Sequence, residues 1–181
     1  MPKRKSVPKR KPARKPAKAS FPQRAEASPK QLVLFELIRA RAALHAALQG
    51  LVPGQAGAPM GAGKWSIRET VLHLITRDQA RLRELEAALR GLTPSWKGAD
   101  DARMGAINAE LLAPITRLEW EEALRLLQLT RLQLIEAVES VPEESAEVWA
   151  DEHPFGWMLR VLPAHDRHHA DIIKRWRARR A

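Results

Sequence analysis

The sequence contains no cysteine among its 181 residues. This absence excludes disulfide bonds, thiolate metal ligands and a cysteine nucleophile, so any thiol chemistry needs a thiol from outside the chain. Long apolar runs are also missing, and those present, such as Leu32 to Leu37, are far shorter than the roughly 20 residues of a membrane-spanning helix. The N-terminus lacks the apolar stretch of a secretory signal. We therefore expect a cytoplasmic protein that does not enter a membrane.

Acidic residues are missing from the start of the chain, and the first is Glu26. Ten of the 31 Lys and Arg residues precede it, and the other 21 are balanced by the 21 acidic residues. The formal net charge of +10 therefore belongs to the N-terminal segment. The chain divides into a basic tail, residues 1–25, and a neutral domain, residues 26–181.

The tail has five prolines, at positions 2, 8, 12, 16 and 22, and few apolar side chains. Prolines at this spacing prevent a regular helix, and little surface is there to bury, so we predict disorder. One interpretation is an electrostatic arm that binds nucleic acid weakly and without sequence preference. The other is a solvated extension without a partner. Phe21 is the one aromatic residue of the tail, which does not favour base stacking.

The domain shows apolar residues at helical spacing, and no stretch alternates as a strand does. Four helices are predicted, at residues 28–50, 66–91, 116–140 and 154–180. Capping boxes mark three of the predicted starts: Ser28 with Gln31, Ser66 with Glu69, and Thr116 with Glu119. The sequence therefore predicts an all-α fold, a four-helix bundle.

The connections carry weaker signals. Residues 51–64 are rich in glycine and proline and predict a loop, without the spacing of a phosphate-binding loop. A short helix is predicted near residues 108–112 within a long connection. Pro163 falls inside the fourth predicted helix and should kink it or remove one hydrogen bond.

Two histidines in the fourth helix carry the main chemical signal. His165 and His169 are four residues apart, so they point the same way about 6 Å apart along the axis. Both share the inward face with apolar side chains, and buried imidazoles need partners for their ring nitrogens. One divalent metal ion would serve both rings. The alternative is a pair of hydrogen-bonded core histidines, while His168 lies off this face and is expected to be exposed.

A third ligand has to come from another helix. The candidates are His73 and Asp78 in the second helix and His45 in the first. Asp78 lies within the apolar stripe of its helix, whereas His73 lies well to the side of it. Periodicity alone does not select His73.

Two segments resemble the DinB/YfiT-like superfamily. KWSIRETVLHLITRDQARL is similar to its second helix, in which a tryptophan and a capped helix start precede a ligand histidine, and FGWMLRVLPAHDRHHADII is similar to its last helix. The resemblance covers roughly residues 28–180. It implies a four-helix bundle of unusual connectivity with three histidines around a divalent ion, here His73, His165 and His169. Asp166 or Asp171 would orient an imidazole, and Pro163 does not match the pattern.

The resemblance also implies a function. Three imidazoles with an open position compose a catalytic metal site, for which zinc or nickel fits best. Family members include transferases and isomerases that use low-molecular-weight thiols, which implies a metal-dependent thiol S-transferase acting on a small electrophile. The alternative is a non-catalytic, metal-stabilised bundle that the basic tail tethers to nucleic acid. A homodimer is compatible with either function. Core packing, rather than a pocket, is expected for Trp65, Trp157 and Trp176.

Overall fold

The computed structural model describes residues 27–180, so the predicted disorder of the basic tail lies outside the described residues. The predicted all-α fold is confirmed, and residues 27–180 contain no strand beyond an isolated bridge between Pro59 and Ser66. The helices are α1 (Pro29–Leu48), α2 (Pro53–Gly57), α3 (Ile67–Leu89), α4 (Asp101–Leu112), α5 (Trp120–Glu139) and α6 (Pro154–Ala178). Two 3-10 turns, η1 (Ala113–Ile115) and η2 (Ala146–Trp149), complete these elements. No helix in this part of the chain has the length and apolarity to cross a membrane.

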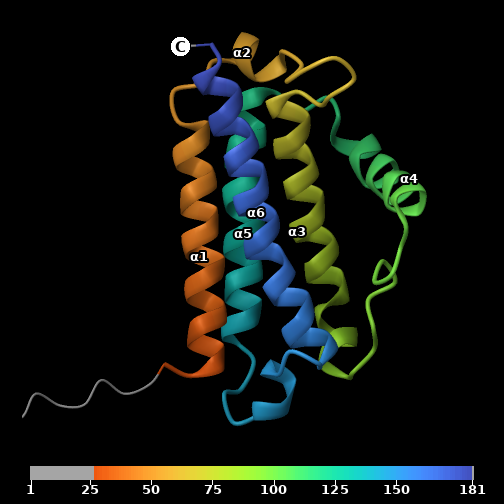
Figure 1. The fold of residues 1–181 in the computed structure, drawn as a ribbon. Helices are drawn as coiled ribbons and strands as arrows, with labels where there is room; N and C mark the ends of the chain where they lie inside the picture. Colours follow the sequence, from red (N-terminus) through yellow and green to blue (C-terminus); the bar gives the residue numbers. More distant parts are fainter. Residues whose placement is uncertain (1–26, 181) are drawn as a thin grey trace, which may run out of the picture.

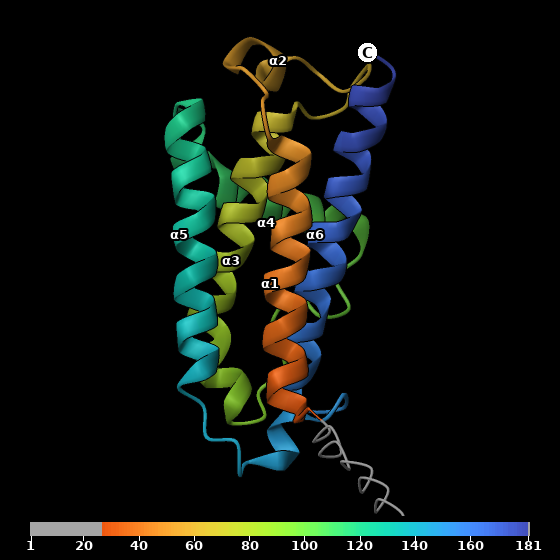
Figure 2. The same ribbon diagram turned by 90° about the vertical axis from the view of Figure 1, so that its left-hand side faces the viewer.

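The four long helices form a bundle in the order α1, α6, α3, α5 around its axis (Figures 1 and 2). Helices α1 and α6 run in one direction and α3 and α5 in the other, so each close pair is parallel. Two parallel neighbours cannot be joined by a short turn. After the end of α3, the chain therefore runs back along the outer side of this helix to reach the start of α5. Helix α4 lies on this returning segment (Figure 1).

Two of the predicted capping boxes are confirmed. The Ser28 side chain accepts a hydrogen bond from the backbone N–H of Gln31, whose side chain accepts one from the Ser28 N–H. At the start of α3, Ser66 and Glu69 form the same reciprocal pair. These bonds satisfy N–H groups that have no partner within the helix, which is why both helices begin where the sequence predicted.

The third capping box was wrong, because α5 begins at Trp120. The Thr116 hydroxyl donates to the Ala113 carbonyl in η1 and does not cap a helix. Arg68 of α3 donates to the carbonyls of Thr116 and Leu118, so this segment is bound to α3 as a turn. The hydrogen bonds from Arg68, which is distant in the sequence, thus determine the conformation of this segment in place of the local capping-box pattern.

Other boundaries also differ from the prediction. The short helix expected near residues 108–112 is the end of the longer α4, whose start is capped by Asp100 through the Arg103 N–H. Helix α2 occupies part of the expected loop. Pro163 is buried inside α6, which continues on both sides of it. Since proline has no N–H, the predicted loss of one helical hydrogen bond applies there.

The interior consists of two apolar clusters separated by a charged layer. One cluster includes Leu44, Ile75 and Ile173, and the other includes Leu37 and Leu162. Between them lie four buried charged residues, one from each long helix: Arg41, Asp78, Arg131 and Asp166. We call these four residues the charged layer.

Each arginine of the charged layer pairs with both aspartates. Arg41 lies 2.9 Å from Asp78 and 3.0 Å from Asp166, and Arg131 lies 2.8 Å and 3.1 Å from the same two carboxylates. The arginines also donate to the backbone carbonyls of Leu127 and Leu37. Burial alone would lower the pKa of Arg131, but the two carboxylates raise it. The layer is electrically neutral and binds all four helices together.

We predict that Asp78→Ala destabilises the fold by about 3–5 kcal/mol, because it leaves two buried guanidinium groups with one carboxylate. Urea unfolding followed by circular dichroism measures the change. As a control, Glu86→Ala removes an exposed ion pair with Arg90 and should alter stability by less than about 0.5 kcal/mol. Equal effects of the two substitutions would contradict the role given to the charged layer.

Candidate metal centre

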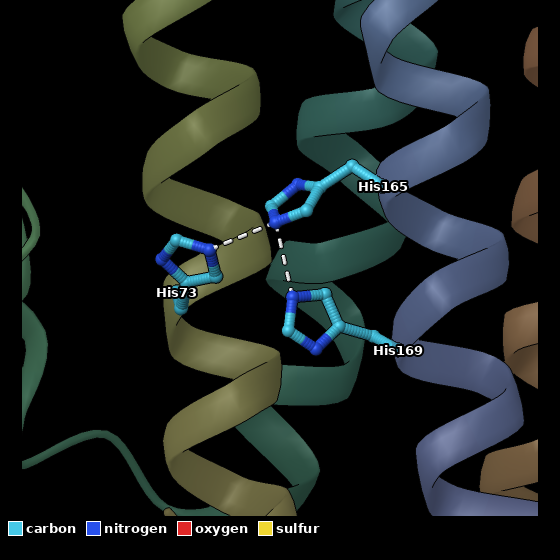
Figure 3. Close-up of side chains that lie close together, drawn as sticks. All are labelled: His73, His165 and His169. Carbon is cyan, nitrogen blue, oxygen red and sulfur yellow. Dashed lines mark hydrogen bonds between the residues drawn. The ribbon is translucent and has the colours of Figure 1, made fainter. Parts of the chain in front are cut away.

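Three imidazole rings from α3 and α6 meet between these two helices (Figure 3). The Nε2 atom of His165 lies 3.1 Å from Nε2 of His73 and 3.0 Å from Nε2 of His169. One ligand atom from each ring lies within 4.8 Å of the other two. The structure therefore brings together the three residues that the resemblance implied.

The location of His73 follows from the packing of α3. Every residue from Thr70 to Asp78 is buried, because α3 packs against α5 and α6 and is also contacted by α4. The side chain at position 73 faces α6 across the helix interface. The polar residues Thr70, His73, Arg77 and Arg81 recur at intervals of three or four, so a polar stripe in the sequence marks this buried face.

The donor set fits a divalent cation. Zn–N bonds of 2.0–2.1 Å in a tetrahedral site place two ligand nitrogens about 3.3 Å apart, close to the two separations of 3.0 Å and 3.1 Å. The imidazoles cannot satisfy one another. The Nε2 atom of His165 either donates one proton or accepts with one lone pair, so it serves one of its two neighbours.

The three rings are neutral at pH 7. Burial lowers the pKa of His73 to about 3, of His165 to about 2 and of His169 to about 4. For His73 and His165, the nearby positive charges of Arg77 and Arg81 lower the pKa further. Neutral imidazole is the form that binds metal ions, so the environment keeps the rings ready to coordinate.

The other candidate ligands lie apart from the triad. Asp78 is committed to the charged layer. His45 is half-buried on α1 and borders a different cavity, which it shares with Leu124 and Gln128 of α5. Of the three candidates from other helices, His73 is the one that reaches the α6 pair. His168 is exposed, as predicted.

The prediction that Asp166 or Asp171 orients an imidazole was wrong. The carboxylate of Asp166 accepts from the arginines of the charged layer, and Asp171 is exposed and lies 3.6 Å from Lys174. Among residues 27–180, the buried Nδ1 atoms of His73 and His169 have no hydrogen-bond partner. Packing, rather than a carboxylate, therefore positions these two rings.

A cavity of about 510 Å³ adjoins the triad at His169. Trp65 forms part of its wall, 37% exposed, with its ring centre 5.0 Å from that of His73. The expectation of core packing was therefore wrong for Trp65. It was right for Trp176, which is 4% exposed, whereas Trp157 stacks on Trp96 and is half-buried. The cavity therefore lies directly beside the three histidines.

A bundle of this connectivity with such a triad is the architecture that the sequence resemblance implied. The sequence pattern of the DinB superfamily matches residues 36–173, so the chain belongs to the DinB superfamily.

Two solved structures share the fold. One is the colibactin self-resistance protein ClbS in complex with a dsDNA, which is 17% identical with a TM-score of 0.70 over 84% of this chain and 98% of that chain. The other is the sibling lethal factor precursor DfsB, which is 16% identical with a TM-score of 0.70 over 86% of this chain and 98% of that chain. Comparison with curated proteins gave no match.

The lowered pKa values predict a pH dependence of stability in the metal-free protein. As the pH falls below about 6.5, the ordinary pKa of an imidazole, histidines of the unfolded chain bind protons whereas the buried rings stay neutral. The folded state therefore loses stability relative to the unfolded state. Urea unfolding from pH 7 to pH 5 should show this loss. Each histidine contributes at most about 1.4 kcal/mol per pH unit.

His165→Gln should make this pH dependence shallower, whereas His168→Gln should change it much less, because His168 is exposed and acts on the triad only through its neighbour His169. A stability that stays constant from pH 7 to pH 5 would contradict the burial of neutral rings.

Proposed function

We propose that His73, His165 and His169 together bind one divalent metal ion, with zinc or nickel as the best match. The observation that carries this proposal is the convergence of one nitrogen from each of the three buried rings. The neutral state of the rings and the membership in the DinB superfamily support it. Three nitrogen ligands leave a coordination position open, which is typical of catalytic rather than structural sites.

We further propose a metal-dependent thiol S-transferase that acts on a small electrophile. A bound divalent ion supplies the chemistry, since it lowers the pKa of a coordinated water or thiol towards neutrality. The thiol has to come from outside, because the chain has no cysteine. The cavity beside His169 gives both reactants a place, and Trp65 forms part of its wall next to His73.

Among residues 27–180, the side chains around the site do not offer a separate general base. Glu69 belongs to the capping box of α3, where it accepts from the Ser66 N–H at 2.7 Å. In the proposed reaction, the thiol sulfur forms a bond to the electrophilic carbon, the leaving group departs with its electron pair, and the thiol proton passes to solvent.

Metal analysis of the full chain tests the proposed site. We expect about one zinc or nickel ion per chain after loading and desalting. His73→Ala, His165→Ala and His169→Ala should each weaken the metal affinity at least about 100-fold, because each removes one of three ligands. His168→Ala is the matched control, since it removes an exposed imidazole of the same helix. Equal metal content in all variants would refute the site.

A second candidate function is a non-catalytic, metal-stabilised bundle that its basic tail holds to nucleic acid. Two observations favour it: the ten basic residues that precede Glu26, and the duplex DNA bound by ClbS. Such binding would be weak, indifferent to sequence and steeply dependent on salt.

Two measurements separate these functions. If the chain is a transferase, the zinc-loaded protein should accelerate the attack of free cysteine on 1-chloro-2,4-dinitrobenzene, and His169→Ala should abolish the acceleration. If the chain is a tethered bundle, duplex DNA binding should vanish when residues 1–25 are removed, with no acceleration at any metal loading. The homodimer and the cytoplasmic location stay predictions, which light scattering and cell fractionation would test.

A further inference from the structure

The cavity beside the triad is lined by basic and apolar residues without an acidic one. Its basic members are Lys64 in the loop before α3, Arg175 in α6 and Arg179 directly after the end of α6. None of them forms an ion pair within residues 27–180, whereas the neighbouring Lys174 and Arg167 both do. Three positive charges that have no ion-pair partner among the described residues therefore border one cavity.

Positive charge also lies behind the triad on α3. Arg77 is 5% exposed, its Nη2 donates to the sulfur of Met104 at 3.4 Å, and no carboxylate of the described chain lies within ion-pair distance. Arg81 pairs with Glu84. A buried cation without a paired carboxylate is costly, so this side of the site attracts negative charge.

The nearby carboxylates offset these charges only in part, since Glu84 pairs with Arg81 and also acts on Arg77. Asp78 and Asp166 are neutralised by the two arginines of the charged layer. Three neutral imidazoles add no charge of their own, so a divalent ion at the triad would add to a region that is already positive. Electrostatic balance then favours a negatively charged ligand.

We infer that the cavity beside the triad binds an organic anion. Its acidic group, a carboxylate, sulfonate or phosphate, is held by Lys64, Arg175 and Arg179, and its apolar body packs against Trp65 and Ile172. The volume of about 510 Å³ lies within the range of small-ligand sites. The inference deepens the proposed function and rests on it, because it names the charge class of the substrate or thiol. The cavity and the proposed metal site are linked by His169, which belongs to both.

Isothermal titration of the zinc-loaded full chain with 2-naphthalenesulfonate tests the inference. The neutral 2-naphthalenemethanol has a similar apolar body, and we expect it to bind at least about tenfold more weakly. Lys64→Gln/Arg175→Gln/Arg179→Gln should weaken sulfonate binding at least about tenfold and leave the alcohol unaffected. Arg179→Gln alone should show a smaller loss in the same direction.

The matched control removes three charges elsewhere. Arg39→Gln/Arg167→Gln/Lys174→Gln changes the net charge equally but does not touch this cavity, so sulfonate affinity should stay within about twofold. Circular dichroism of both triple variants verifies the fold. Equal binding of the two naphthalene probes, or an equal loss in both triple variants, would overturn the inference.

Failure of the proposed function is distinguishable from failure of this inference. If the protein binds no metal but holds the sulfonate through the three cations, the metal proposal fails and the anion site stands. If metal binds and the sulfonate does not, the anion site fails alone. If the protein binds duplex DNA but no sulfonate, and the cavity triple variant abolishes the DNA binding, the ligand of these cations is nucleic acid. This outcome would overturn the inference of a small organic anion.

Discussion

The neutral set of ion pairs at the centre of the bundle determines how the four helices stand relative to one another. Each arginine contacts both aspartates, and a slide of one helix by a turn would leave buried charges without partners, at a cost of several kcal/mol. Asp166 directly follows His165, and Asp78 lies just over one turn beyond His73. The helix register that pairs the charges is therefore also the register that brings the imidazoles of α3 and α6 together.

Helix content and two helix starts were predictable because their causes are local. The boxes at Ser28 and Ser66 act within four residues, and the structure has both. Thr116 and Glu119 carry the same pattern, but η1 and the bonds from Arg68 hold that segment in another conformation. A local pattern predicts a helix start only where no distant side chain competes for the same backbone groups. The resemblance implied an unusual connectivity, but the parallel pairing of the helices had no local signal and was not predicted.

The candidate metal centre was predictable in part. His165 and His169 followed from their spacing on one helix, whereas His73 needed the family resemblance, because a wheel that counts apolar residues overlooks a buried polar face. Asp78 was a candidate ligand because it lies in the apolar stripe of its helix. Its position there reflects ion pairing in the core rather than metal binding. The cavity could not be predicted, because Trp65 and Arg175 meet there through the packing of segments that are distant in the sequence.

The triad joins residues that lie 92 positions apart in the chain. An ion held there would act as a covalent cross-link does, by closing a loop of that length and restricting the unfolded chain. The chain-entropy estimate for a loop of this size is about 4–5 kcal/mol, comparable with the whole net stability of many small proteins. A chain without cysteine would thus gain a cross-link between α3 and α6, and a chelator could remove this cross-link.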